Sequence, residues 1–358
     1  MLWLGCRPIS RGELSPVVYE GNALGHGLDC DAASGHVQGM LQHLNTEVSR
    51  RALFRNAATA VAALMIPAPL AACIPDRRAR QTDPGQGRLH QWSGVLRKEG
   101  LARPDVPLGK AVVRVGELAG GSPYQPYTLE TYLKAGGNPL EEPLTLSLTH
   151  FDCVTLVEAC LAISRLADDD AAPSWDRFGE EVERMRYRGG DRRGYTSRLH
   201  YFSEWISDGK RRGLVQDRGA ELGGAEDRRP LRFMSEHRGS YLALNDESVF
   251  REISAIERRL DSQPRRVIPT KRIPEVVNRI DTGDVLGFAT EISGLDVSHT
   301  ALAYRDREGI LRVLHAPLSG GVVEVTRTTL PEYVAAIRRA TGILVARPLR
   351  AQELDAQG

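Results

Sequence analysis

Four residues have the types and the spacing needed for nucleophilic catalysis: Cys153, Cys160, His299 and His315. A cysteine thiolate attacks a carbonyl carbon, and a neutral imidazole takes the proton from the thiol. Both cysteines lie in THFDCVTLVEACLAISRL, residues 149–166. If this segment is helical, their Cα atoms are roughly 10.5 Å apart, beyond the reach of a disulfide. Each cysteine therefore needs its own explanation.

Cys153 is the better candidate for a nucleophile. Thr149 and Asp152 form a pattern typical of a helix cap, so the apolar helix is expected to begin there. Cys153 then lies in the first turn, where the helix dipole favours a thiolate and backbone N–H groups can form half of an oxyanion hole. Cys160 lies two turns further along among apolar residues, and it is expected to be a small buried side chain.

The two histidines lie near the ends of two predicted strands. His299 opens a strand after a turn, and His315 ends the next strand. If the strands pair as a hairpin across DREG, residues 306–309, the imidazoles project on the same face of the sheet. One would then act as the base, and the second would fix its tautomer and orientation. A lone histidine at a strand end is more often structural, so the spacing suggests a triad without establishing it.

The pattern of predicted elements changes along the chain. Helical patterns dominate up to residue 260, interrupted by two β-prone segments, YTLETYL at 127–133 and PLTLSL at 143–148. The last third carries closely spaced short strands separated by turns. Helices followed by a run of strands indicate an α+β fold with an antiparallel sheet and a single core.

The overall composition excludes some classes of function. Hydrophobic residues make up 41% of the 358 residues and charged residues 26%, which is ordinary for a globular protein. The formal net charge of +1 provides no general attraction for polyanions. We therefore expect no nucleic-acid partner.

Residues 40–72 are typical of an export signal. A short arginine-containing segment precedes an apolar run, residues 57–70, that is too short for a stable membrane-spanning helix. LAAC at 70–73 resembles a bacterial lipobox, so Cys73 is expected to carry lipid and to hold the protein on the periplasmic side, at the outer membrane. SRRALF at 49–54 resembles a twin-arginine motif and leaves the export route open. The alternative is a buried or interfacial helix with a chance Ala-Ala-Cys.

This interpretation divides the chain into five parts. Residues 1–39 are an upstream extension, either non-native with Met40 as the start or disordered, and 73–90 form a polar tether. A catalytic domain is expected over 91–350, followed by a tail at 351–358. Of the five cysteines, only Cys153 and Cys160 remain in the exported body, unpaired in an oxidising compartment.

Three segments resemble the NlpC-type superfamily of papain-like cell-wall cysteine hydrolases: FDCVTLVE, GDVLGFATEISGLDVSHTALAYR and LHAP. The resemblance covers most of residues 95–348. It implies a papain-like fold, in which a nucleophile-bearing helix packs on a central antiparallel sheet beside an N-terminal helical part. It also implies Cys153 as nucleophile, His299 as base and His315 as the third member. One departure is LHAPLSGG, where a Ser-rich continuation would be expected.

The intervening segment RYRGGDRRGYTSRLHYFSEWISD resembles one branch of that superfamily, which is N-acetylmuramoyl-L-alanine amidase-like and was once catalogued as a domain of unknown function. This implies cleavage between a muramyl sugar and L-alanine in peptidoglycan fragments, with a preference for ends bearing anhydro-muramic acid. Peptidoglycan or muropeptides are the implied partners.

Four further residues are candidates for substrate binding. Asp152 either only caps its helix or also meets the polar end of the substrate peptide, as the residue before the nucleophile does in relatives. Tyr195, Ser197 and Arg198 lie in a polar loop that could bind stem-peptide carboxylates, since arginine pairs bidentately with them. The alternative is a loop held by its own hydrogen bonds.

The leading hypothesis is a lipid-anchored amidase that acts through a thioacyl-enzyme and needs no cofactor and no metal. A zinc site at Cys153, His299 and His315 lacks the usual paired-ligand spacing. An endopeptidase that cuts the D-glutamyl–diaminopimelate bond remains an alternative within the same superfamily. A non-catalytic lipoprotein that binds wall fragments is the alternative from another class. Lipid acyl transfer occurs in permuted relatives with His before Cys, whereas here Cys comes first.

Overall fold

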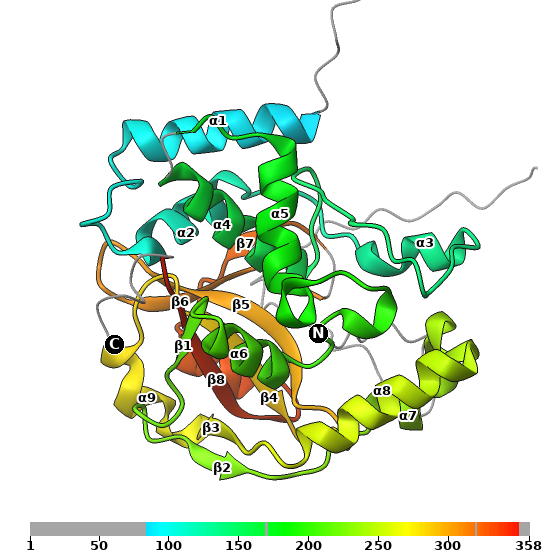
Figure 1. The fold of residues 1–358 in the computed structure, drawn as a ribbon. Coiled ribbons are helices and arrows are strands. Elements are labelled where there is room, and N and C mark those ends of the chain that lie inside the picture. The colour runs from blue at the N-terminus through cyan, green and yellow to red at the C-terminus, as the bar shows by residue number, and fades with distance from the viewer. Residues whose placement is uncertain (1–83, 169–170, 319–320, 351–358) are drawn as a thin grey trace, which may run out of the picture. The chain divides into compact units, whose positions relative to one another are not determined.

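An antiparallel sheet with helices on both faces makes up the part of the chain that the computed structural model describes, residues 84–168, 171–318 and 321–350 (Figure 1). The helices are α1 (Pro84–Lys98), α2 (Leu108–Leu118), α3 (Thr131–Lys134), α4 (Cys153–Ala167), α5 (Trp175–Arg186), α6 (Phe202–Arg211), α7 (Phe233–Glu236), α8 (Glu247–Leu260), α9 (Ile273–Val276) and α10 (Leu330–Ala336). The strands are β1 (Val215–Asp217), β2 (Ala225–Asp227), β3 (Arg265–Pro269), β4 (Val285–Thr290), β5 (Val297–Arg305), β6 (Leu311–His315), β7 (Glu324–Val325) and β8 (Ala340–Pro348). The predicted α+β class is confirmed.

The strands follow the order β2-β3-β8-β4-β5-β6-β7, and β1 pairs with the second half of β8. All pairings are antiparallel. The predicted hairpin of β5 and β6 is confirmed, with Arg305 opposite Leu311. The last strand, β8, lies between β3 and β4, so the end of the chain completes the centre of the sheet.

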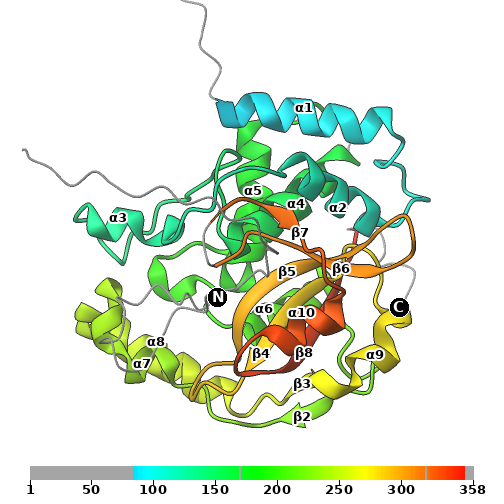
Figure 2. The same ribbon diagram turned by 180° about the vertical axis from the view of Figure 1, so that it is seen from behind.

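Both faces of the sheet are covered. Leu302, Leu314 and Leu344 belong to a core that they share with α1, α2, α4, α5 and α6, of which Figure 1 shows α4, α5 and α6 on the near side. On the opposite face Phe288 and Ile343 pack under α9 and α10, which lie in front of the sheet in Figure 2. Because side chains alternate between two buried faces, β4 is buried along its whole length.

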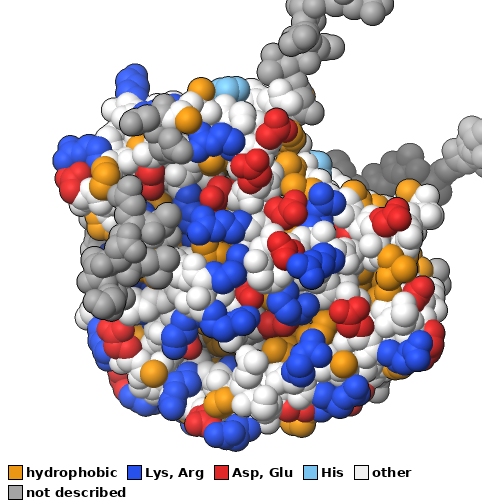
Figure 3. All heavy atoms as spheres, in the orientation of Figure 1, with side chains coloured by type: hydrophobic (Ala, Val, Ile, Leu, Met, Phe, Trp, Pro, Cys, Tyr) orange, Lys and Arg blue, Asp and Glu red, His pale blue; other side chains and the backbone are white. Residues whose placement is uncertain are grey.

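A third apolar cluster joins α7 and α8 to the loop before α6. Tyr195, Tyr201, Phe233 and Ile253 belong to it. The outer surface over α5, α6 and β2 carries basic and acidic side chains that intermix, as Figure 3 shows. This arrangement agrees with the near-zero net charge.

Helix α4 is buried on nearly all sides, since every residue except Arg165 is buried. The buried residues include Glu158, and Arg186 at the end of α5 is buried as well. Two guanidinium nitrogens of Arg186 donate to Glu158 at 2.7 and 3.0 Å, and a third donates to the carbonyl of Thr145 at 2.7 Å. A buried carboxylate needs such a partner, and the partner lies 28 residues away in sequence.

Two β-prone segments do not form strands. Residues 128–134 form a 3₁₀ turn and α3, and residues 143–148 form neither helix nor strand. The hydroxyl of Thr128 donates to the carbonyl of Gln125, and that of Thr131 donates to the carbonyl of Thr128. Such local bonds favour a turn over a strand.

Some predicted boundaries fall outside the described residues. Residues 84–90, expected in the tether, form the first half of α1, where Leu89 is fully buried. The extension 1–39, the signal 40–72, the rest of the tether and the tail 351–358 are not described. None of the described helices is long and apolar enough to cross a membrane.

The close contact of α6 with β4 predicts a steric effect at Gly287. A Cβ atom at this position would overlap the ring of Phe202. We expect Gly287→Ala to lower the free energy of unfolding by about 1–3 kcal/mol. Gly94→Ala on α1, where a Cβ meets nothing within 4 Å, should instead raise it by about 0.5–1 kcal/mol. Urea unfolding of both variants measures the difference, and equal effects would contradict the packing argument.

Candidate active site

Cys153 is the first residue of α4, and Asp152 caps this helix. One carboxylate oxygen of Asp152 accepts from the N–H groups of Val154 and Thr155 at 2.9 and 2.8 Å, and the hydroxyl of Thr155 accepts from the N–H of Asp152. The capping pair is therefore Asp152 with Thr155, not Thr149 with Asp152. This box fixes the start of the helix at Cys153.

The first turn of α4 rests against β5. The hydroxyl of Thr300 donates to the carbonyl of Cys153 at 3.1 Å. The thiol also lies against Thr300, whose N–H and hydroxyl lower the pKa of Cys153 and so offset part of a rise that burial causes. Thr300 follows His299 directly, so the start of α4 lies beside the segment of β5 that carries His299, although neighbouring side chains of a strand point to opposite faces.

His299 and His315 form a buried pair. The hairpin brings His299 Nε2 within 2.8 Å of His315 Nδ1, which makes a hydrogen bond between the rings. The ring of His299 stacks on Phe288, with centroids 5.6 Å apart and an interplanar angle of 23°. The hydroxyl of Tyr333 on α10 lies 3.3 Å from His315 Nδ1. These contacts hold both rings in place.

The outer nitrogens of this pair have no hydrogen-bond partner among the described residues. They are His299 Nδ1 and His315 Nε2. His299 Nδ1 is thus the nitrogen that remains available for a thiol proton. It makes no hydrogen bond with Cys153 here, and such bonds are often long before substrate binds.

Burial keeps the catalytic candidates neutral in the free protein. Burial and then the charge of Asp152 raise the pKa of Cys153 to about 12. Burial lowers the pKa of His299 well below its usual value, and His315 lowers it further. Burial also lowers the pKa of His315 to about 4. The expected stabilisation of a thiolate by the helix start is therefore outweighed by desolvation.

Asp152 is itself perturbed, since complete burial raises its pKa to about 7. Its second carboxylate oxygen has no hydrogen-bond partner among the described residues. The capping role is thus confirmed, and the second oxygen is left for another donor. Contact with a substrate remains a prediction.

The three loop candidates lie in a buried polar cluster. The guanidinium of Arg198 pairs with Glu130 and lies 3.6 Å from Glu142. The hydroxyl of Ser197 donates to the carbonyl of Gly194 at 2.7 Å. These partners fit the alternative of a loop held by its own hydrogen bonds, and binding of stem-peptide carboxylates by Ser197 and Arg198 remains a prediction.

Tyr195 belongs to the same cluster but differs in one respect. It is 1% exposed, its ring lies 4.7 Å from the guanidinium of Arg198, and its hydroxyl has no hydrogen-bond partner among the described residues. The ring packs against His200, whose Nε2 lies 2.9 Å from the Tyr195 carbonyl oxygen. Substrate contact by Tyr195 remains a prediction.

Sequence reasoning missed Tyr124, Tyr333 and Glu324. Tyr124 forms a parallel bridge with Phe151, and burial together with Cys153 and Asp152 raises its pKa. Glu324 on β7 is the cross-strand partner of His315. No local pattern marks these residues, because long-range pairing brings each of them to the site.

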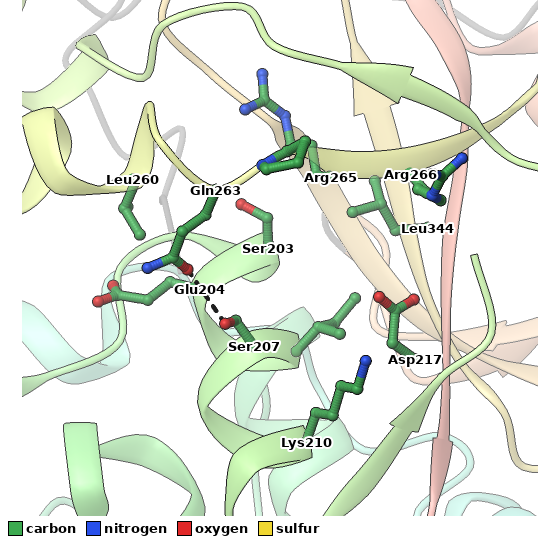
Figure 4. A pocket seen from close by; sticks show the side chains of 12 residues that line it. Ser203, Glu204, Ser207, Lys210, Asp217, Leu260, Gln263, Arg265, Arg266 and Leu344 are labelled. Carbon is green, nitrogen blue, oxygen red and sulfur yellow. Dashed lines mark hydrogen bonds between the residues drawn. The ribbon is translucent and has the colours of Figure 1, made fainter. Parts of the chain in front are cut away.

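A separate cavity of about 190 Å³ lies beside α6, between this helix and the segments around β1 and β3 (Figure 4). Ser203, Lys210, Asp217 and Gln263 are among the residues that line it, and Cys153, His299 and His315 are not. We assign no chemistry to it. No cluster of metal-ligating side chains occurs within the described ranges.

Comparison with known proteins gives one family match. The AmiA-like family model, described as N-acetylmuramoyl-L-alanine amidase-like, matches residues 115–343. The search against curated proteins gives no match.

The chain resembles several solved structures. An N-acetylmuramoyl-L-alanine amidase from Bacteroides uniformis is 30% identical, with a TM-score of 0.62 over 68% of this chain and 99% of that one. A protein described as a putative xylanase from Bacteroides fragilis is 31% identical, with a TM-score of 0.59 over 65% and 99%. A Legionella pneumophila protein at 17% identity has a TM-score of 0.53 over 74% and 94%, which shows the fold alone.

The charge of Asp152 predicts how the reactivity of Cys153 changes with pH. Above pH 7 this carboxylate is ionised and disfavours a neighbouring thiolate. Asp152→Asn should therefore speed alkylation of Cys153 by iodoacetamide at pH 8.5 roughly three- to tenfold, where tenfold corresponds to one pKa unit. The cap is kept, because asparagine caps equally well.

The effect should vanish at pH 5.5, where the native Asp152 is protonated. Peptide mass mapping separates Cys153 from the other cysteines, and the fully buried Cys160 serves as the internal control. An equal gain at both pH values would exclude the charge of Asp152 as the cause.

Proposed function

Because the chain belongs to the AmiA-like family of N-acetylmuramoyl-L-alanine amidase-like peptidoglycan hydrolases, we propose that it cleaves the amide between an (anhydro-)N-acetylmuramic acid and L-alanine with Cys153 as nucleophile. The buried hydrogen bond between His299 and His315, next to the contact of Thr300 with Cys153, carries this proposal. We further propose that the chain is papain-like, with α4 as the nucleophile-bearing helix on the sheet.

The first chemical step transfers the proton of Cys153 to His299 Nδ1, the nitrogen without a partner. Sγ attacks the lactyl carbonyl carbon and pushes its electron pair onto oxygen. Asp152 occupies the N–H groups of Val154 and Thr155, which points to the N–H of Cys153 as a donor to this oxyanion. His299 then protonates the amine of L-alanine, and the C–N bond breaks to leave a thioester.

The second step releases the acyl group. Water gives a proton to His299 Nδ1 and attacks the thioester carbon, the C–S bond breaks, and the proton returns to sulfur. His315 holds the imidazole of His299 throughout, at 2.8 Å. The thiol of the free protein has a pKa of about 12. We therefore propose that bound substrate helps to form the ion pair of thiolate and imidazolium. The substrate would do so by displacing groups around Asp152 and Cys153 or by donating hydrogen bonds to them.

We also propose that the protein is exported and anchored by lipid at Cys73, on the periplasmic side of the outer membrane. The arginine-containing segment, the short apolar run and LAAC support this proposal. Peptidoglycan lies in the same compartment, so location and proposed substrate agree.

The muropeptide reaction tests the catalytic proposal. Cys153→Ala and His299→Ala should each lower kcat by on the order of 10³-fold or more, because nucleophile and base act as a unit. The control is Cys160→Ala, which changes a buried side chain two turns away on the same helix. Mass analysis of defined muropeptides should show a free stem peptide that begins with L-alanine.

Other products distinguish the alternatives. An L-Ala–D-Glu dipeptide end would identify the endopeptidase, and the amidase proposal would then fail. Binding of muropeptides with no product would identify a non-catalytic module.

The lipid anchor has its own test. Cys73→Ser should abolish metabolic labelling of the chain by a fatty acid in a bacterial host, whereas Cys153→Ser should leave labelling unchanged. Labelling that survives in Cys73→Ser would overturn the assignment of Cys73.

A further inference from the structure

The hydrogen bond between the two imidazoles permits two arrangements of protons. Each neutral ring carries one N–H and one bare nitrogen. In the first arrangement His299 Nε2–H donates to His315 Nδ1, so His299 Nδ1 is bare and His315 carries its proton on Nε2. In the second, His315 Nδ1–H donates to His299 Nε2, and His299 carries its proton on Nδ1.

Only the first arrangement lets His299 act as a base. The proposed mechanism needs a bare Nδ1 to accept the thiol proton, and the second arrangement blocks this nitrogen with hydrogen. The 2.8 Å contact of the rings is compatible with both. The hydroxyl of Tyr333, 3.3 Å from His315 Nδ1, can donate or accept and therefore adapts to either. The selection must come from the far nitrogen, His315 Nε2.

His315 Nε2 is buried and has no hydrogen-bond partner within the described residues. The nearest carboxylate is that of Glu324, whose Oε1 lies 3.8 Å away. Glu324 on β7 stands directly opposite His315 on β6, so the two side chains share one face of the sheet. A carboxylate only accepts hydrogen bonds, so it favours a proton on Nε2.

We propose that Glu324 is a positioning residue that selects the productive tautomers of His315 and His299 and thus extends the proposed triad to Cys153–His299–His315–Glu324. This inference rests on the proposed function. The side chain of Glu324 is 55% exposed, which leaves it free to close the remaining gap to Nε2 directly or through one water molecule. The carboxylate of Glu324 also favours the single positive charge that the pair of imidazoles carries after the thiol has lost its proton.

The groups that face His315 come from three elements. They are His299 on β5, Tyr333 on α10 and Glu324 on β7. Among them only Glu324 has a carboxylate side chain. The other role for a charged residue on the edge strand β7 is to discourage pairing with another chain. That role places no demand on the nitrogen atoms of His315.

Three variants of the full-length protein separate the two roles. Glu324→Gln keeps an acceptor oxygen and should retain kcat within about threefold. Glu324→Ala removes the acceptor and should lower kcat by about 10-fold with KM unchanged, because the loss affects the orientation of the imidazoles and not substrate binding. Glu324→Lys places a donor at Nε2, favours the blocked tautomer and should lower kcat by about 100-fold or more. The control is Glu308→Ala, which removes an exposed carboxylate from the turn between β5 and β6.

Nitrogen-15 NMR of histidine-labelled protein reports the tautomers directly, without substrate. We expect protonated His315 Nε2 and bare His299 Nδ1 in the wild type, and the reverse in Glu324→Lys. Unchanged tautomers and unchanged kcat in Glu324→Ala and Glu324→Lys would overturn the role of Glu324. If the wild type cleaves no muropeptide, the proposed function fails, and the NMR result still decides whether Glu324 sets the tautomers.

Discussion

The contact between the first turn of α4 and strand β5 is the constraint on which the candidate site depends. A hydroxyl on the strand holds the carbonyl of Cys153, and the capping box of Asp152 sets where the helix starts. The strand also carries His299 at the next position. A shift of one residue in strand register would turn His299 to the other face of the sheet. The start of α4 and the register of the hairpin of β5 and β6 must therefore be fixed together.

Burial of ionisable groups in α4 and in the candidate site costs free energy unless each group has a partner or stays neutral. Helix α4 carries Glu158 into the interior, and Arg186 with the carbonyl of Thr145 satisfies it. Asp152, Cys153 and the two histidines are also shielded from water, and each has a pKa shifted toward its neutral form. Removing water from the site strengthens the electrostatic interactions of every charge that forms in it. The burial that suppresses a thiolate in the free protein therefore also favours stabilisation of that thiolate once a positive partner is in place.

The parts of the fold and of the site that could be predicted are those encoded locally. The helix start at Cys153 follows from neighbouring residues, and the pairing of β5 with β6 follows from a short turn between two strands. The ion pair of Glu158 with Arg186 could not be predicted, because 28 residues separate them and each alone looks solvated. Three further features could not be predicted either: the central place of β8, the bridge of Tyr124 with Phe151, and the partners of Arg198. Those depend on long-range pairing, which propensity and periodicity do not encode.

The 6% exposure of Cys153 and its high pKa have a consequence for damage. Oxidation to sulfenic and sulfinic acids proceeds through the thiolate and requires access to the sulfur. A thiol that stays protonated and covered reacts slowly with peroxide. In an oxidising environment such a cysteine would keep its thiol longer than an exposed, ionised cysteine would.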